Sequence, residues 1–122
     1  MFLTNYLKKN WSKSSVFVRT EYNNLMRHIE IMDTTLRDGE QTSGVAFSAA
    51  EKLTTAQLLL EEVKVDRIEV ASARVSEGDF EAVKKITSWA AEKGYLEKVE
   101  ILTFVDGEAS LDWMEKAGAS IY

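Results

Sequence analysis

The sequence of 122 residues contains no cysteine and no proline, has a single histidine, and shows no long apolar run. Without cysteine, neither a disulfide framework nor a thiolate-bound metal is possible, and the composition fits a reducing, cytoplasmic location. No apolar run approaches the ~20 residues that a membrane-spanning helix requires, so we expect no membrane partner. Without proline, we expect helix starts to rely on side-chain caps.

Several motifs of catalysis and nucleic-acid binding are also missing. The sequence shows no nucleophile–base pair, no glycine-rich phosphate loop and no alternation of aromatic and basic residues. The single histidine, His28, precedes the first predicted strand and lies away from the other polar loops. We interpret it as a surface residue rather than a metal ligand.

Charge is distributed unevenly along the chain, whose formal net charge is −5. Residues 1–28 carry five basic side chains against Glu21 alone, whereas the remainder carries ten basic and nineteen acidic side chains. The acidic body argues against nucleic acid as the main ligand. The basic head has two interpretations: a targeting peptide, or a disordered or non-native extension before a true start at Met26 or Met32. We adopt the second interpretation and place the domain at 29–122.

From residue 29 onward, short apolar runs alternate with segments of helical periodicity. The apolar runs predict strands at 29–34, 66–72 and 98–104, and the start of a fourth strand at 120–122. Between them, a capping box at 48–51 predicts a helix to about Val63, and Ser76 caps a second helix that stops at Gly94. A third, shorter helix is predicted to end at Gly118.

This alternation predicts right-handed βαβ units and a parallel sheet, so the fold class is α/β. Two architectures remain open: a small, open, doubly wound sheet, or the opening segment of a (β/α)8 barrel. An open sheet of the flavodoxin type needs about five strands and a closed barrel takes ~250 residues. The 122 residues reach only the start of a fourth strand, so we expect the chain to be incomplete under either architecture.

Polar side chains gather where the predicted strands end, at 37–41, 69–74 and 102–106. In parallel α/β folds, ligands bind at the carboxyl ends of the strands. Asp38 offers oxygen ligands suited to Mg²⁺, Mn²⁺ or Zn²⁺, and Arg37 offers a fork of donors suited to a carboxylate or a developing oxyanion. The alternative is an ordinary ion pair that caps the loop without binding a ligand.

Glu69 lies inside the second predicted strand, between Ile68 and Val70. If it faces inward it needs a charged partner, because burying an unpaired carboxylate is costly. Arg37 is the natural candidate for that partner. The alternation of side chains along a strand equally allows Glu69 to face outward at an edge.

The run "DTTLRDGEQ" at 33–41 resembles the signature of the 2-isopropylmalate, homocitrate and citramalate synthases, roughly D-x-T-L-R-D/E-G-x-Q, directly after a strand. "GVAFSAAEKL" at 44–53 resembles the synthase continuation, and "VDRIEVASARVSEGDFEAVKKI" at 65–86 extends the similarity. These enzymes form a metal-dependent barrel superfamily together with the hydroxymethylglutaryl-CoA lyases. The resemblance covers about residues 29–119. It implies the N-terminal segment of a (β/α)8 TIM barrel, with about three βα units and the start of a fourth strand.

The resemblance also implies roles for individual residues. Arg37 is expected to be the catalytic arginine that binds the 2-oxoacid carbonyl and stabilises the enolate of acetyl-CoA, and Asp38 to be a ligand of a divalent metal (Mg, Mn or Zn). Substrate-binding roles are implied for Arg37 itself and for four further positions: Gln41, Glu69, Leu102 and Phe104. The implied reaction joins acetyl-CoA to a 2-oxoacid and then hydrolyses the thioester, in branched-chain amino-acid biosynthesis. The parent enzyme is expected to be a homodimer.

Two departures from the family pattern bear on these expectations. Isopropylmalate synthases usually have His at the position of Leu102, and an apolar residue there resembles the citramalate enzymes, which accept pyruvate. The family also completes its metal site with a later His-x-His pair and a later general base, which these 122 residues lack. We therefore expect this chain alone to be inactive. Two alternatives stay open: a non-catalytic fragment or interaction module, and an enzyme resembling hydroxymethylglutaryl-CoA lyase.

Overall fold

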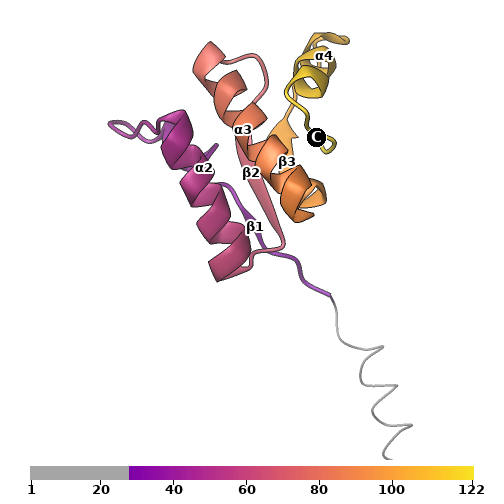
Figure 1. Ribbon diagram of the computed structural model, residues 1–122. Coiled ribbons are helices and arrows are strands. Elements are labelled where there is room, and N and C mark those ends of the chain that lie inside the picture. The colour runs from indigo at the N-terminus through magenta and orange to yellow at the C-terminus, as the bar shows by residue number, and fades with distance from the viewer. Residues whose placement is uncertain (1–27) are drawn as a thin grey trace, which may run out of the picture.

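The structure, a computed structural model, describes residues 28–122 and contains a parallel sheet whose strands follow the chain order. Three strands pair in the order in which they are numbered: β1 (Met32–Asp33), β2 (Arg67–Ser72) and β3 (Val99–Leu102) (Figure 1). Ile121 forms a parallel bridge with Glu100, so the chain begins to pair again beside β3. The α/β class and the predicted strand order along the chain are confirmed.

Helices connect the strands where the periodicity predicts them: α2 (Ala49–Gln57), α3 (Glu77–Lys93) and α4 (Ala109–Lys116). α2 continues as a π-helical segment, Leu58–Val63, which ends at Lys64 with a left-handed φ of 63°. α3 ends at Gly94, whose φ of 78° is a conformation that a residue without a Cβ adopts readily. Two short 3₁₀ turns, Gly39–Gln41 and Leu96–Lys98, complete the connections. None of the described helices is long and apolar enough to cross a membrane.

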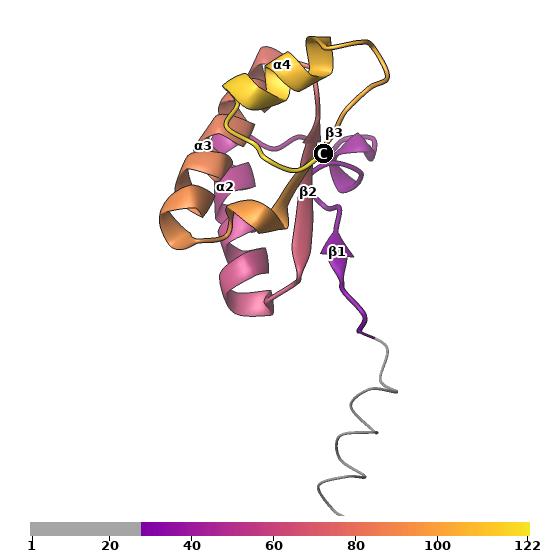
Figure 2. The ribbon, with the colours of Figure 1, turned by 90° about the vertical axis from the view of Figure 1, so that its right-hand side faces the viewer.

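All three helices lie on the same side of the sheet, as the two perpendicular views show (Figures 1 and 2). A doubly wound sheet would reverse its strand order and place helices on both faces. Consecutive parallel strands with right-handed connections instead keep their helices on one face. The described strands therefore follow the order of a singly wound sheet, and its closure into a barrel stays a prediction.

The hydrophobic core lies between the sheet and the helices. β2 contributes Ile68 and Val70, and β3 contributes Val99 and Ile101, all at most 1% exposed. The facing helix residues are small or branched and form one cluster with the strands: Ala56, Leu60, Val83, Ile86 and Ala90. Because this core fixes β2 against α2 and α3, the loops at the carboxyl ends of the strands start from rigid supports.

The first strand is shorter than the predicted 29–34. Asp66 Oδ2 accepts a hydrogen bond from Ile31 N at 2.8 Å, so this amide is not available to a neighbouring strand. Ile31 O still accepts from the backbone amides of Asp66 and Arg67, at 3.1 and 3.2 Å. The Asp66 side chain thus replaces one backbone hydrogen bond of the expected β-ladder. Hydrophobic patterning alone does not indicate such a replacement.

The third strand is likewise shorter than the predicted 98–104. Phe104 N donates to Ser110 Oγ at 3.4 Å, which turns the chain away from the sheet after Leu102. His28 is exposed and lies 3.4 Å from Glu30, so its prediction as a surface residue is confirmed. The predictions for residues 1–27 lie outside the described residues.

The predicted capping box is present at the start of α2. Ser48 Oγ accepts from Glu51 N at 3.3 Å, and Glu51 Oε2 accepts from Ser48 N at 2.8 Å and from Ser48 Oγ at 2.7 Å. These bonds, the side-chain one first, lower the pKa of Glu51 below its ordinary value of 4.5. A lowered pKa contributes stability that is present above pH 4.5 and is lost as the pH falls through the depressed value.

We therefore expect Ser48→Ala to lower the free energy of unfolding by about 1 kcal/mol at pH 7, and by less at an acidic pH below the lowered pKa of Glu51. Urea denaturation at both pH values measures the difference. Ser88→Ala is the control, because Ser88 Oγ donates to Lys84 O inside α3 and caps no helix. Equal losses in the two variants, or a loss that does not shrink in acid, would contradict the capping account.

Candidate active site

The loop after β1 is held in one conformation by its own backbone. Thr34 O accepts hydrogen bonds from the amides of the three residues 37–39, at 3.1, 2.7 and 3.1 Å. Asp33 closes the preceding turn, because its carboxylate accepts from Thr35 N at 2.9 Å and from Thr35 Oγ1 at 3.1 Å. Leu36 is 1% exposed and anchors the loop in the core. The loop thus directs residue 37 and its neighbours toward the carboxyl end of the sheet.

Arg37 joins two carboxylates at this end of the sheet. Its Nε and Nη2 both lie 2.7 Å from Glu69 Oε2 on β2, and its Nη1 lies 3.2 Å from Asp38 Oδ1. The side chains of Arg37 and Glu69 are 22% and 11% exposed, whereas that of Asp38 is 64% exposed. The predicted pairing of Arg37 with Glu69 is confirmed. The contacts of Nε and Nη2 with Glu69 Oε2 fix the orientation of the Arg37 guanidinium. The Asp38 side chain remains mostly exposed to solvent.

A cavity of about 530 Å³ lies between the first loop, the start of α2, the end of β2 and the start of α3. Of the predicted site residues, Arg37 and Gln41 line it. The other four, Asp38, Glu69, Leu102 and Phe104, do not line it; Leu102 ends β3 and is 40% exposed, and Phe104 follows β3 and is 50% exposed. The structure therefore brings the first loop and β2 together, and leaves the predicted third-strand residues outside this cavity.

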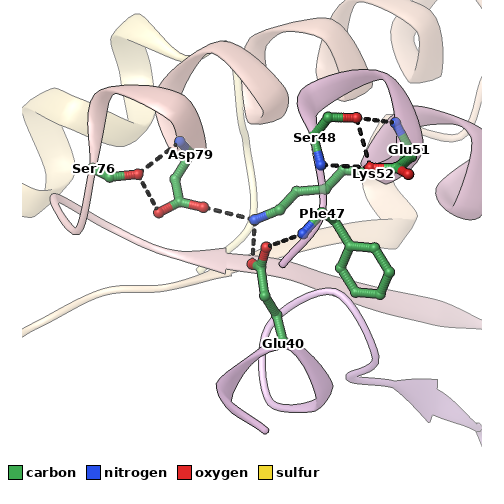
Figure 3. A network of polar contacts seen from close by, with 7 residues as sticks. All are labelled: Glu40, Phe47, Ser48, Glu51, Lys52, Ser76 and Asp79. Atoms are coloured by element: carbon green, nitrogen blue, oxygen red, sulfur yellow. Dashed lines mark hydrogen bonds and ion pairs between the residues drawn. The ribbon is translucent and has the colours of Figure 1, made fainter. Parts of the chain in front are cut away.

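A buried lysine that lines the same cavity is the main feature that the sequence interpretation missed. Lys52 of α2 is 3% exposed, and its Nζ lies 2.5 Å from Glu40 Oε2 and 2.7 Å from Asp79 Oδ1 (Figure 3). A signal was present in the sequence, because Lys52, Ala56 and Leu60 recur at four-residue intervals and so share one helix face. All three are buried.

The two carboxylates keep Lys52 charged. Burial by itself lowers the pKa of a lysine, but the hydrogen bonds to Asp79 and Glu40 outweigh it, so the pKa of Lys52 lies above its ordinary value of 10.5. A raised pKa contributes stability that is fully present below pH 10.5 and is lost only as the pH rises through the raised value. Lys52 is therefore a buried cation at neutral pH.

A second ion pair joins the other two loops at this end of the sheet. Arg74, which follows β2 with a left-handed φ of 62°, places its Nη1 2.7 Å from Asp106 Oδ2 after β3. Asp106 also accepts from the amide and hydroxyl of Ser110, at 3.1 and 2.8 Å. The Ser110 hydroxyl first, and Arg74 next, lower the pKa of Asp106. Two loops that are far apart in sequence are thus linked at this end of the sheet.

Among the described residues, no group of three or more His, Cys, Asp or Glu side chains could hold a metal ion. Asp38 is suitable as one ligand, since its carboxylate is exposed and only one oxygen lies near Arg37. One carboxylate does not make a metal site, because divalent ions of this kind require several protein ligands. Residues 28–122 therefore provide one candidate ligand of such a site, Asp38.

Comparison with known proteins assigns the chain to a family. Residues 28–115, well over half of the chain, match the sequence model of the HMGL-like family. The chain belongs to the HMGL-like family. The resemblance inferred from residues 33–41 and their surroundings is confirmed by this match and by the names of its relatives.

Three relatives of this HMGL-like chain indicate the branch that it resembles. A 2-isopropylmalate synthase of Staphylococcus carnosus is 53% identical over 62 residues, which are 51% of this chain and 12% of that protein. A 2-isopropylmalate synthase of Pyrococcus abyssi is 51% identical over 63 residues, 52% of this chain and 13% of that protein. An Archaeoglobus fulgidus protein named "Putative (R)-citramalate synthase CimA" is 51% identical over 59 residues, 48% of this chain and 12% of that protein. The matched part of the chain thus spans about an eighth of the length of these relatives.

Proposed function

We propose that this HMGL-like chain forms the opening part of the catalytic domain of an acetyl-CoA-dependent 2-oxoacid synthase, of the 2-isopropylmalate or citramalate type. The observation that carries the proposal is the cluster of Arg37 with Glu69 and Asp38 at the carboxyl ends of β1 and β2. A guanidinium fixed by one acid and flanked by an exposed second acid suits a site where a cation and a keto acid meet.

The proposed domain is a (β/α)8 barrel that further βα units complete. The consecutive strand order and the one-sided helices support closure rather than a doubly wound sheet. Apolar side chains are exposed around the two outer strands: Ile29, Ile31, Leu102, Phe104, Val105 and Tyr122. Uncovered parallel strand edges are unfavourable in water, so additional strands on both sides account for this exposure.

In the proposed reaction, Arg37 binds the 2-oxoacid carbonyl oxygen and stabilises the negative charge that develops on the acetyl-CoA enolate. Glu69 orients the guanidinium through Nε and Nη2, which leaves Nη1 directed toward Asp38. Gln41 lines the cavity beside Arg37 and holds substrate there. Preorganised hydrogen-bond donors of this kind lower the activation barrier, because they need not rearrange as the oxyanion forms.

Asp38 would hold the divalent metal, together with ligands from outside residues 28–122. When bound, the metal supplies a Lewis acid that polarises the substrate ketone. The methyl group of acetyl-CoA loses a proton to a base outside this segment, the new C–C bond forms at the ketone carbon, and water cleaves the thioester to release free CoA. The chain alone is therefore expected to be inactive.

The test is release of free thiol by the complete enzyme that contains this segment, in the presence of acetyl-CoA and Mg²⁺ or Mn²⁺. We expect CoA release only when a 2-oxoacid is added, and loss of release when EDTA removes the metal. Comparing the rates with pyruvate and with 2-oxoisovalerate then identifies the preferred 2-oxoacid, since a hydrophobic pocket distinguishes the two by the size of their apolar groups. A difference of about 1–3 kcal/mol corresponds to a 10- to 200-fold preference. A folded, metal-loaded enzyme that releases no thiol with any 2-oxoacid would refute the proposal.

A further inference from the structure

We propose that Lys52 is a positioning residue of this site, which holds the loop bearing Arg37, Asp38 and Gln41 by clamping Glu40 against Asp79. The inference rests on the proposed function, because it assigns a role to Lys52 within that same site. Lys52 Nζ contacts one oxygen of each carboxylate, at 2.5 and 2.7 Å.

Each clamped carboxylate uses its second oxygen to fix the segment from which it comes. Glu40 Oε1 accepts from Phe47 N at 3.0 Å and so closes the loop that leads into α2. Asp79 Oδ2 accepts a hydrogen bond from Ser76 Oγ at 2.7 Å. Ser76 Oγ in turn accepts from Asp79 N at 3.0 Å and so caps α3. Figure 3 shows Lys52 as the link between these two closed segments. The lysine therefore joins elements that the backbone leaves separate.

Glu40 transmits this restraint to the proposed reactive groups. It belongs to the 3₁₀ turn Gly39–Gln41, directly after Asp38, and its own amide donates to Thr35 O at 3.1 Å. Gln41 N donates to Asp38 O at 3.1 Å, so the turn moves as a unit with Asp38. Displacement of the Glu40 side chain would thus move the exposed carboxylate of Asp38 and the side-chain amide of Gln41.

Stability alone does not explain a lysine at this position. Lys52 shares its helix face with Ala56 and Leu60, which are 0% and 3% exposed, so an apolar side chain would continue the buried stripe. Replacing buried ion clusters with apolar side chains is often neutral or stabilising when all the charges are removed together. The side chains of Glu40 and Asp79 remain 24% and 16% exposed on the cavity side, beside Arg37 and Gln41. The charge of Lys52 therefore lies where it can hold the loop of residues 37–41 in place.

Two variants of the complete enzyme separate positioning from stability. Lys52→Met leaves two carboxylates without their cation. The triple variant Lys52→Met, Glu40→Gln and Asp79→Asn removes all three charges, while its amide oxygens can still accept from Phe47 N and Ser76 Oγ. Lys85→Met, an exposed lysine on α3, is the matched control.

The first readout is amide hydrogen exchange of residues 37–41, whose amides are all hydrogen-bonded within the loop. The second is kcat and KM for CoA release. We expect Lys52→Met and the triple variant to exchange these amides at least about tenfold faster and to lose about 10- to 100-fold in kcat, the range for outer residues that orient a reactive group. The triple variant is expected to unfold at the wild-type urea concentration, and Lys85→Met to match wild type throughout.

Wild-type exchange and wild-type kcat in a stably folded triple variant would overturn the positioning role. The exchange readout does not depend on the reaction. If the wild-type enzyme releases no CoA, the proposed function fails, and the exchange rates of residues 37–41 still decide whether Lys52 holds the loop.

Discussion

Arg37→Lys in the complete enzyme is expected to lower kcat for CoA release by about 10²- to 10³-fold, the usual cost of losing one charge-stabilising donor. Lysine keeps the charge but not the planar fork that contacts Glu69 Oε2 through two nitrogens. A single ammonium nitrogen can contact both carboxylates, but it cannot keep three donors in the fixed plane that orients the guanidinium between Glu69 and Asp38. Steady-state kinetics with saturating acetyl-CoA measures the loss.

The matched control is Arg67→Lys on β2. Arg67 Nη1 lies 2.6 Å from Glu100 Oε1, so it also pairs with a carboxylate across the sheet, but at the amino end of the strand. We expect its kcat to stay within a few-fold of wild type. Equal losses in the two variants would show that Arg37 acts through the stability of the sheet, which would contradict its catalytic role.

Glu69→Leu is expected to lower the free energy of unfolding by about 3 kcal/mol, and to lower kcat as well. The loss lies at the lower end of the range for a buried pair broken on one side, because Arg37 is 22% exposed and keeps Asp38 as a partner. Urea denaturation and thiol release measure the two effects on the same preparation.

A double variant separates these two effects of Glu69. Arg37→Met with Glu69→Leu removes both charges, so most of the lost stability should return while kcat stays low. Glu100→Leu is the control for a strand carboxylate with a different partner, since Glu100, the register partner of Glu69 on β3, pairs with Arg67 and not with Arg37. Recovery of activity together with stability in the double variant would contradict the role of the pair in the reaction.

Much of the fold could be predicted from the sequence because its local signals agree. Ser48 with Glu51 marks the start of α2, Ser76 caps α3 and Gly94 ends it, each at the predicted residue. The strand bounds were less accurate, because side chains such as Asp66 and Ser110 divert backbone amides from the ladder. Such competition depends on tertiary geometry, which periodicity does not contain.

The candidate site was predictable only in part, for a related reason. The Arg37–Glu69 pair follows from two facts visible in the sequence: an acid inside an apolar strand needs a partner, and parallel strands end at one edge. The Lys52 cluster draws on three elements whose contacts involve sequence separations of up to 27 residues. A lysine among helix residues is ordinarily assigned to the surface, and only its four-residue spacing from Ala56 and Leu60 indicated otherwise.

The most direct test of the central claim is a crystal structure of the complete enzyme with Mn²⁺ and pyruvate. We predict an anomalous peak for the metal within about 2.2 Å of an Asp38 oxygen, with an Arg37 nitrogen in hydrogen-bonding distance of the keto oxygen. A metal bound without Asp38, with Arg37 paired only to Glu69 and apart from the substrate, would contradict the account.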